Sequence, residues 1–211
     1  MRVTTSDQRP ARVGGLVLAA GRAHRFGGAK LLAAFRGGTL VSHVLATAGA
    51  ARSRGLLVSI HAVVAEGDEP VERLARENGA TPVVNPDPGR GLSSSLTIGL
   101  NAMSADLDAA LVFLGDQPLV RLDVIDAVVR AWHQGTSSVV RPRYGAAPDV
   151  PGHPVLLARD VWPLAAQREG DGGFGARFAP GAPGVLVVDV PGDNPDVDTP
   201  ADLLALKDLR R

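Results

Sequence analysis

The feature that most constrains the fold of this chain is a repeated alternation of short apolar runs with segments of helical periodicity. Residues 13–19, 56–64, 81–84 and 109–114 form apolar runs with the length and character of buried strands. Apolar residues recur at helical spacing around residues 40–45 and over residues 71–78, 93–103 and 122–132. Because apolar strands joined by helices are typical of a parallel sheet covered on both faces, we expect an α/β fold. The specific expectation is a Rossmann-like three-layer sandwich with a mostly parallel sheet.

The second half of the chain has a looser pattern than the first. Beyond residue 137, Pro- and Gly-rich stretches surround apolar segments at residues 154–157 and 185–190 and a short helical segment at residues 162–167. A final helix is expected from Asp198 to Leu209, because Asp or Thr can cap it and Pro200 suits a first turn. We expect residues 1–12 to form a flexible N-terminus and residues 13–211 a single domain.

Composition excludes several classes of partner. The 22 Lys and Arg residues balance the 22 Asp and Glu residues, so no net field draws the protein to nucleic acid or to an anionic membrane. The chain has no cysteine, which excludes disulfides and thiolate metal sites. No apolar run approaches the roughly 20 residues of a membrane span, and the polar start of the chain does not resemble a signal peptide. We therefore expect a cytoplasmic protein with no nucleic-acid or membrane partner.

A Gly-rich segment follows the first expected strand and has the chemistry of a phosphate-binding loop. Residues 21–30 combine small residues with cations, among them Arg25 and Lys30. Backbone amides of such a turn can converge on an anion while the two cations neutralise a triphosphate. The glycine spacing fits neither the P-loop nor the dinucleotide fingerprint, which argues against a kinase or a dehydrogenase. The alternative is an exposed loop whose cations serve solubility alone.

Five ordered motifs carry a family resemblance. LAAG-x-x-x-RFGG-x-K at residues 18–30 resembles the signature loop of the nucleotidyltransferases that attach a nucleotide to the pterin of the molybdenum cofactor. The other four matches are Asn85-Pro86 with GLSSSL at residues 91–96, GDQP at 115–118, GHPV at 152–155 and the stretch DVDTPADL that contains Asp198. Ala23 stands where the family often has Ser or Gly, which keeps the residue small but removes a hydroxyl donor.

The resemblance implies a fold and a donor nucleotide. The fold is that of nucleotide-diphospho-sugar transferases, with a nucleotide-binding half at residues 13–136 and an acceptor-binding half at residues 137–211. Ala20 resembles the cytidylyl-transferring branch, which favours CTP. The positions that match the family's nucleotide-binding residues are Leu18, Ala19, Ala20, Gly21, Lys30, Asn85, Ser93 and Ser94. The serines also have a purely structural interpretation, since such a run can simply begin a helix.

Two aspartates are candidate ligands of Mg²⁺. Asp116 directly follows an expected strand, so its carboxylate should emerge beside the loop at the strand's carboxyl end. Mg²⁺ prefers a few carboxylates together with phosphate oxygens and water. The resemblance gives Asp116 this role and suggests a second metal contact from Asp198 across the cleft. For Asp198, helix capping is an almost equal alternative, and Asp193 and Asp196 lie close to it in sequence.

The implied reaction is the transfer of CMP from CTP to molybdopterin or the molybdenum cofactor. A phosphate oxygen of the acceptor attacks the α-phosphorus and pyrophosphate leaves, so that no general base is required. Arg25, Lys30 and Asp116 are the expected catalytic residues, and His153 is expected to contact the pterin-phosphate acceptor. The product would serve a molybdoenzyme partner.

Three alternatives to this function stay open. The first is a nucleotidyltransferase for another phosphorylated acceptor, such as a sugar phosphate. The second is an NAD(P)H-dependent oxidoreductase of a quinone-like substrate, against which the missing dinucleotide fingerprint argues. The third is a carrier that holds the cofactor without catalysis, against which the presence of Lys30 and Asp116 argues.

Overall fold

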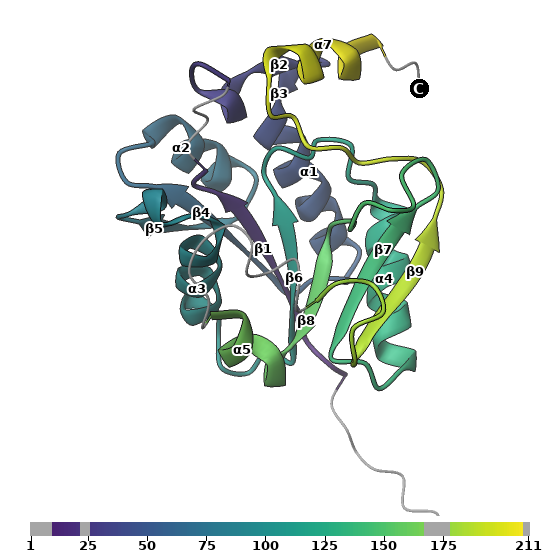
Figure 1. Cartoon of the computed structure of the whole chain (residues 1–211). Helices are drawn as coiled ribbons and strands as arrows, with labels where there is room; N and C mark the ends of the chain where they lie inside the picture. The colour runs from purple at the N-terminus through teal and green to yellow at the C-terminus, as the bar shows by residue number, and fades with distance from the viewer. Residues whose placement is uncertain (1–9, 22–25, 167–177, 209–211) are drawn as a thin grey trace, which may run out of the picture.

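A seven-stranded sheet forms the centre of the computed structural model, which describes residues 10–21, 26–166 and 178–208 (Figure 1). In spatial order the strands are β5 (Thr81–Asn85), β4 (Ser59–Ala65), β1 (Val13–Ala19), β6 (Ala109–Leu114), β8 (Val155–Ala158), β7 (Val139–Tyr144) and β9 (Val185–Val190). Only β8 runs antiparallel to its neighbours, β6 and β7. The expected mostly parallel sheet is confirmed.

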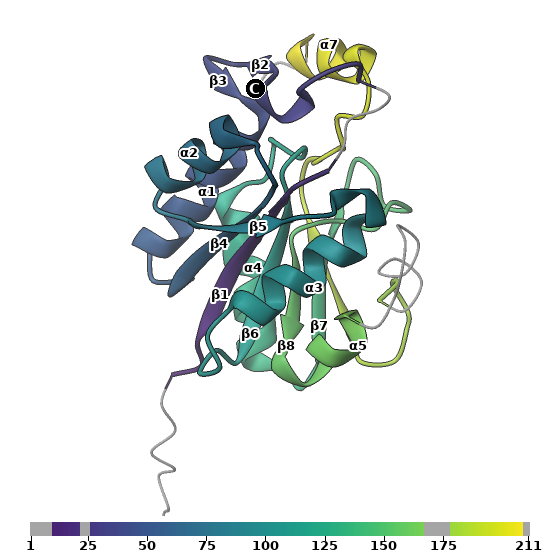
Figure 2. The same cartoon turned by 90° about the vertical axis from the view of Figure 1, so that its left-hand side faces the viewer.

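Helices cover both faces of this sheet. The covering helices are α1 (Leu40–Ser53), α2 (Glu69–Glu77), α3 (Leu92–Ala102), α4 (Leu122–Gln134) and α5 (Trp162–Ala166). A further helix, α7 (Pro200–Asp208), lies beyond the strand ends. Figure 2 shows α1 and α2 on one side of the sheet and α3 and α5 on the other. An apolar core lies on each face of the sheet, and alternate residues of β1 point into one or the other. Val17 packs with α1 and α4 on one face, while Leu16 packs with α3 on the opposite face. The three-layer arrangement is thus confirmed, and it explains why the central strands are apolar on both faces.

The first half of the chain follows the expected element order closely. Strands β1 and β6 have the bounds that the apolar runs predict, and β5 extends one residue further. Strand β4 begins at Ser59 rather than at residue 56, because Leu56 to Val58 form the link from α1. Helix α2 begins two residues before the expected start, where the Asp68 carboxylate accepts a hydrogen bond from the Val71 amide.

The structure adds elements that the sequence pattern did not predict. Strand β7 lies in the stretch interpreted as loose, where Arg141, Pro142 and Arg143 interrupt the apolar run. A two-stranded hairpin, β2 (Ala34–Phe35) and β3 (Gly38–Thr39), precedes α1. This hairpin packs against α7 through a small apolar cluster that includes Phe35 and Leu206, at the top of Figure 1.

The strand order reverses direction between β1 and β6. From β1 the chain builds outward to β4 and β5, then returns through α3 to β6 on the other side of β1. A crevice at the carboxyl ends of the strands at such a point is the usual ligand site of open α/β sheets. Two of the sequence motifs, the Gly-rich loop and GDQP, begin at these two strand ends. None of the helices in the described ranges is long and apolar enough to cross a membrane.

Candidate functional site

A lysine held between two carboxylates marks the crevice. The Nζ atom of Lys30 donates to the Oδ2 atom of Asp116 at 2.7 Å and to the Oδ1 atom of Asp198 at 3.1 Å. The Lys30 side chain is only 11 % exposed, and those of Asp116 and Asp198 are 22 % and 38 % exposed. Residues 86 and 168 positions from Lys30 therefore meet it in one polar cluster.

Backbone contacts explain how these three residues come together. The amide of Gly115 donates to the carbonyl oxygen of Leu18, which joins the end of β6 to the end of β1. A Cβ atom at Gly115 would lie 3.1 Å from that oxygen, so the close approach favours glycine. The Val197 amide donates to the Asp116 carbonyl oxygen, which anchors the segment before α7 beside the GDQP turn. Asp198 therefore reaches Lys30 on the same wall as Asp116.

The electrostatics of the cluster are those of a shared cation. Burial alone would lower the pKa of Lys30, but the carboxylates of Asp116 and Asp198 more than offset it and raise that pKa above its ordinary value. Lys30 is therefore charged at neutral pH. A third carboxylate, Asp196, lies nearby, and burial together with repulsion from Asp116 raises its pKa.

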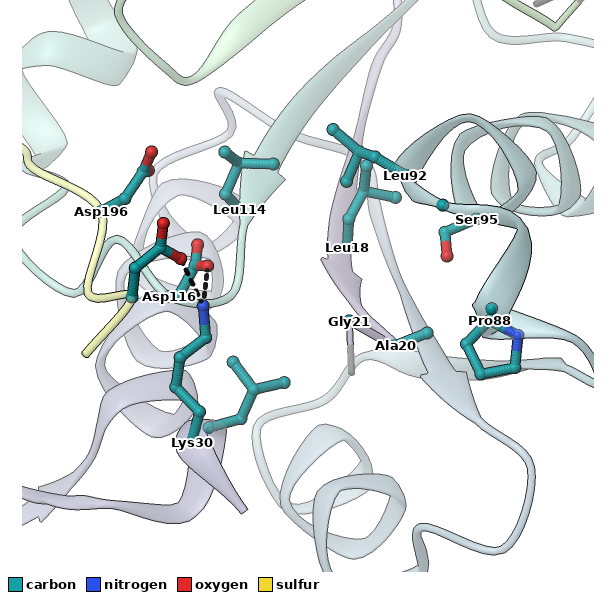
Figure 3. Close-up of a pocket in the computed structure, with 14 residues that line it drawn as sticks. Leu18, Ala20, Gly21, Lys30, Pro88, Leu92, Ser95, Leu114, Asp116 and Asp196 are labelled. Atoms are coloured by element: carbon teal, nitrogen blue, oxygen red, sulfur yellow. Dashed lines mark hydrogen bonds and ion pairs between the residues drawn. The ribbon is translucent and has the colours of Figure 1, made fainter. Parts of the chain in front are cut away.

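This cluster forms one wall of a pocket of about 420 Å³. Figure 3 shows Lys30, Asp116 and Asp196 on one side and Pro88, Leu92 and Ser95 on the other, with Leu18, Ala20 and Gly21 between them. The charged groups of the pocket are gathered on one wall, and uncharged residues line the rest. Such a division suits a ligand that is charged at one end and has an uncharged ring at the other.

The structure separates the predicted nucleotide-binding residues into two groups. Leu18, Ala20, Gly21 and Lys30 line the pocket, whereas Ala19, Asn85, Ser93 and Ser94 are not part of its lining. Ser95, the third serine of the same run, does line the pocket. Arg25, the other predicted catalytic cation, lies outside the described residues, as does Ala23.

Asn85 stabilises, through hydrogen bonds, the wall of the pocket opposite Lys30. It is 1 % exposed, and its Nδ2 atom donates to the hydroxyls of Ser94 at 3.1 Å and Ser95 at 2.9 Å. Its Oδ1 atom accepts a hydrogen bond from the Asp87 amide at 3.0 Å. Asn85 therefore links the end of β5 to the first turn of α3. The serines do not cap α3, because its N-cap residue is Gly91 and no side chain caps it.

Asp198 is not the N-cap of the final helix. The capping hydrogen bonds at the start of α7 are made by Thr199 and Asp202: the Asp202 amide donates to the Thr199 hydroxyl, and the Thr199 amide donates to the Asp202 carboxylate. The alternative capping role of Asp198 is therefore wrong, and its carboxylate is directed to Lys30 instead. The expectation that Asp198 faces Asp116 across the cleft is also wrong, since the two share one cation on one wall.

A second pocket adjoins the first and contains the predicted acceptor residue. His153 lines this cavity of about 380 Å³, and Leu92, Leu114 and Asp196 line both pockets. The Nε2 side of Gln117 donates to the Asp196 carboxylate, and its Oε1 atom accepts from Asn194, so a polar chain runs from one pocket to the other. Two neighbouring cavities with a common wall can hold two substrates side by side.

Comparison with known proteins decides the family. A model of the MobA-like NTP transferase domain matches residues 15–198, which span β1 to Asp198 of the charged cluster. The chain belongs to the MobA-like NTP transferase domain family. As a member of that family it is a nucleotidyltransferase, and its α/β fold is the one expected of the family.

Two curated relatives of this MobA-like transferase are cytidylyltransferases. The molybdenum cofactor cytidylyltransferase of Escherichia coli (strain K12) is 26 % identical over 153 residues, which cover 72 % of this chain and 73 % of that protein. The 2-C-methyl-D-erythritol 4-phosphate cytidylyltransferase of Streptomyces avermitilis is 34 % identical over 148 residues, covering 64 % of this chain and 57 % of that protein.

A solved structure of similar shape is that of Rv0371c from Mycobacterium tuberculosis H37Rv. It is 26 % identical, has a TM-score of 0.79, and the match covers 95 % of this chain and all of the other. The same protein has been crystallised in complex with manganese, and that structure is 24 % identical with a TM-score of 0.75 over 93 % of this chain and 98 % of its own.

The residues of this MobA-like transferase fit a divalent cation. The described part of the chain has no group of three or more His, Asp or Glu residues arranged to hold a metal by themselves. However, the oxygen atoms of Asp116 and Asp198 already converge on one cation, the Nζ atom of Lys30. Two carboxylates that leave the other positions to phosphate oxygens and water match the preference of Mg²⁺.

Sequence reasoning missed several polar residues of the two pockets. The sequence favours Asp198 over Asp196 as a metal ligand, whereas the extended segment before α7 brings both to the crevice. Gln117 lies within the GDQP motif but has no predicted role, and Asn194 gave no signal, because the two pair with each other only in the folded chain. Arg141 had one available signal, since a charged residue inside the apolar run that begins at Val139 is unusual for a buried strand.

Proposed function

We propose that this protein transfers CMP from CTP to molybdopterin or the molybdenum cofactor and releases pyrophosphate. The observation that supports this most is the cluster of Lys30, Asp116 and Asp198 at the pocket between the ends of β1 and β6. Support for the acceptor comes from the similarity to the Escherichia coli molybdenum cofactor cytidylyltransferase. The product would pass to a molybdoenzyme partner.

The pocket suggests how the nucleotide lies. The triphosphate belongs at the charged wall, where Lys30 can donate to phosphate oxygens. Base and ribose then extend toward Pro88, Leu92 and Ser95 at the start of α3. Ala20 is buried between the two walls, and the choice of CTP within the proposal rests on the similarity to two cytidylyltransferases.

The chemical step needs charge stabilisation more than proton transfer. A phosphate oxygen of the acceptor forms a bond to the α-phosphorus of CTP, and the bond from that phosphorus to the bridging oxygen of the departing pyrophosphate breaks. The nucleophile is already ionised, so no side chain has to remove a proton. Lys30 stabilises the charge that develops on the phosphates, and it is placed for this task by its two carboxylate partners.

Asp116 and Asp198 are the residues that would hold Mg²⁺. When bound, the metal supplies positive charge to the phosphate oxygens of the donor. Asp196 lies near this pair, where burial and repulsion from Asp116 raise its pKa. The proposed acceptor site is the second pocket, with His153 in its wall.

A second candidate function is cytidylyl transfer to a phosphorylated sugar or sugar alcohol. It is favoured by the similarity to the Streptomyces avermitilis enzyme, which is named for 2-C-methyl-D-erythritol 4-phosphate. The nucleotide pocket serves both candidates equally, so the acceptor has to discriminate between them. The membership in a transferase family gives no support to the oxidoreductase and carrier alternatives.

The direct test is pyrophosphate release by the purified protein with Mg²⁺ and CTP, GTP or ATP in turn. Each nucleotide is assayed alone, with molybdenum cofactor and with 2-C-methyl-D-erythritol 4-phosphate. Asp116→Asn removes one charge of the cluster, and Asp126→Asn on α4 is the matched control, since Asp126 forms its ion pair with Arg130 one turn away on the same helix. We expect release that requires both CTP and molybdenum cofactor and is lost in Asp116→Asn alone.

Other outcomes reassign or overturn the proposal. Release with the erythritol phosphate but not with the cofactor selects the second candidate. Release with GTP in preference to CTP would show that the donor nucleotide is GTP rather than CTP. No release with any pair of substrates, from protein whose unfolding transition is normal, overturns the transferase reaction proposed for this pocket.

A further inference from the structure

The wall of the second pocket contains a buried arginine that the proposed reaction does not use. Arg141 lies on β7 and is 1 % exposed. It lines the second pocket together with Tyr144, His153 and Asn194. Arginine is rarely buried to this degree unless it is paired, because transfer of its charge out of water is costly.

Backbone oxygens are the partners of Arg141. Its Nη1 atom donates to the carbonyl oxygen of Phe178 at 2.7 Å, and its Nη2 atom donates to that of Gly152 at 3.1 Å. These bonds fix the guanidinium but do not neutralise it. No carboxylate of the described residues makes an ion pair with Arg141, and its buried Nε–H has no acceptor there. Burial accordingly lowers the pKa of Arg141 to about 10.

The other polar groups of the pocket leave this charge uncompensated. The positive charge of Arg141 and, above all, burial lower the pKa of His153 to about 3, so that His153 is neutral at physiological pH. Tyr144 donates its hydroxyl to the His153 carbonyl oxygen at 2.7 Å. Asp196 is hydrogen-bonded by Gln117, and neither it nor Asp193, which also lines the pocket, forms an ion pair with Arg141.

We propose that Arg141 is an anion-binding residue of the second pocket and that it selects acceptors with an oxyanion group. This proposal rests on the proposed function only in taking the second pocket as the acceptor site. A fixed guanidinium with an unused N–H is preorganised for a phosphate or carboxylate oxygen. The bound anion would supply the negative charge that balances Arg141 and that the surrounding residues do not provide. Acceptors that lack an acidic group at this position would bind weakly.

A nuclear magnetic resonance titration tests the site without any nucleotide or acceptor. The Nε–H signal of Arg141, identified by its absence in Arg141→Lys, is followed as inorganic phosphate, acetate or chloride is added at constant ionic strength. Because the signal belongs to one side chain, phosphate that binds beside Lys30 does not disturb the readout. Arg143→Lys is the matched control, since Arg143 lies on the same strand but is paired with Asp189 at the surface.

We expect a saturable shift of the Nε–H signal with an oxyanion and no shift with chloride. A response to phosphate but not to acetate assigns the site to a phosphate group, and the reverse assigns it to a carboxylate. The oxyanion affinity should fall about tenfold or more in Arg141→Lys, measured on neighbouring backbone amides of β8, because the lysine lacks the planar donor fork. The affinity should be unchanged in Arg143→Lys. A signal that responds to no oxyanion, or equally to chloride, overturns the proposal.

A kinetic experiment separates this inference from the proposed function. In the pyrophosphate assay, Arg141→Lys should raise the KM for the acceptor about tenfold or more and leave the KM for CTP unchanged. A purely structural role would lower kcat without this selective change in KM. If the protein transfers CMP but Arg141→Lys leaves the acceptor KM unaltered, the inference fails while the proposed function stands. If no transfer occurs, the titration still decides the anion site.

Discussion

At the scale of single residues, Lys30 is the group on which the proposed nucleotide pocket depends most. Lys30→Gln removes the cation that faces the pocket and leaves Asp116 and Asp198 to repel each other. We expect kcat/KM for the nucleotide to fall by about 10²- to 10³-fold, the size of effect found when one electrostatic contact to a transition state is removed. Lys207→Gln on the exposed face of α7 is the control. A loss below about tenfold would show that Lys30 does not contact the reacting phosphates.

His153 gives the stability of the protein a specific dependence on pH. Its pKa is about 3 in the folded protein against an ordinary value of 6.5, because of burial and the nearby Arg141. Between these values only the unfolded chain binds the proton, so the free energy of unfolding falls as pH falls below 6.5, by at most about 1.4 kcal/mol per pH unit. Above 6.5 the contribution is fully present. His153→Gln should reduce this slope in urea titrations between pH 7 and pH 5, about the window in which carboxylates contribute least.

The control for this pH dependence is His133→Gln, since His133 is exposed at the end of α4. That variant should keep the slope of the unmodified protein. An unchanged slope in His153→Gln would mean that His153 takes up its proton in the folded state as readily as in the unfolded state.

For single residues, the sequence indicates which side chains belong to the pocket better than it indicates which distant side chains contact one another. Lys30 and Asp116 were identified from a loop motif and from the end of a strand, two signals that are local in the chain. Asp196 and Asn194 were not, because their roles depend on Val197 binding to the backbone of Asp116, a contact between distant segments. Of the three serines at the start of α3, only Ser95 lines the pocket, because a helical turn rotates adjacent residues apart.

At the scale of elements, the packing of α3 on the sheet leaves no room for a side chain at Gly99. A Cβ atom at Gly99 would come within 2.6 Å of Leu16 and 2.8 Å of Val63. Gly99→Ala should therefore cost about 1–3 kcal/mol through overpacking, which exceeds the roughly 1 kcal/mol that alanine contributes to helix propensity. Urea unfolding should show a net loss of stability.

Gly49 in α1 is the matched control for this prediction. Its Cβ would meet only the Asn78 carbonyl oxygen at 3.5 Å, an ordinary contact. Gly49→Ala should raise the free energy of unfolding by up to about 1 kcal/mol. If both variants stabilise the protein, the packing of α3 on β1 and β4 is looser than the structure shows.

Element boundaries were predictable where one physical signal dominated. Strands β1 and β6 are apolar on both faces, and their bounds followed from that pattern alone. Strand β7 was missed because its buried arginine and its proline contradict a strand pattern, and only tertiary contacts with Phe178 and Gly152 accommodate the charge. The β2–β3 hairpin is too short to produce a period, and its stability comes from packing against α7.

At the scale of the whole molecule, stability should not depend on metal. Lys30 satisfies Asp116 and Asp198 without any other cation, so chelation of divalent metals with EDTA should leave Tm unchanged while abolishing transfer. Mg²⁺ with CTP at about 100 times Kd should add about 2.7 kcal/mol and raise Tm by about 5–10 °C. Scanning calorimetry with and without EDTA measures both. A marked fall of Tm on chelation would instead indicate a structural metal.

The wall shared by the two pockets constrains the order of events in catalysis. Leu92, Leu114 and Asp196 face both cavities, so a donor and an acceptor in these sites lie against each other rather than taking turns in one site. An enzyme built in this way has no need of a covalent nucleotidyl-enzyme, and its initial-rate plots should show intersecting rather than parallel lines when both substrates are varied. Pyrophosphate, which would remain at the charged wall, should then compete with CTP.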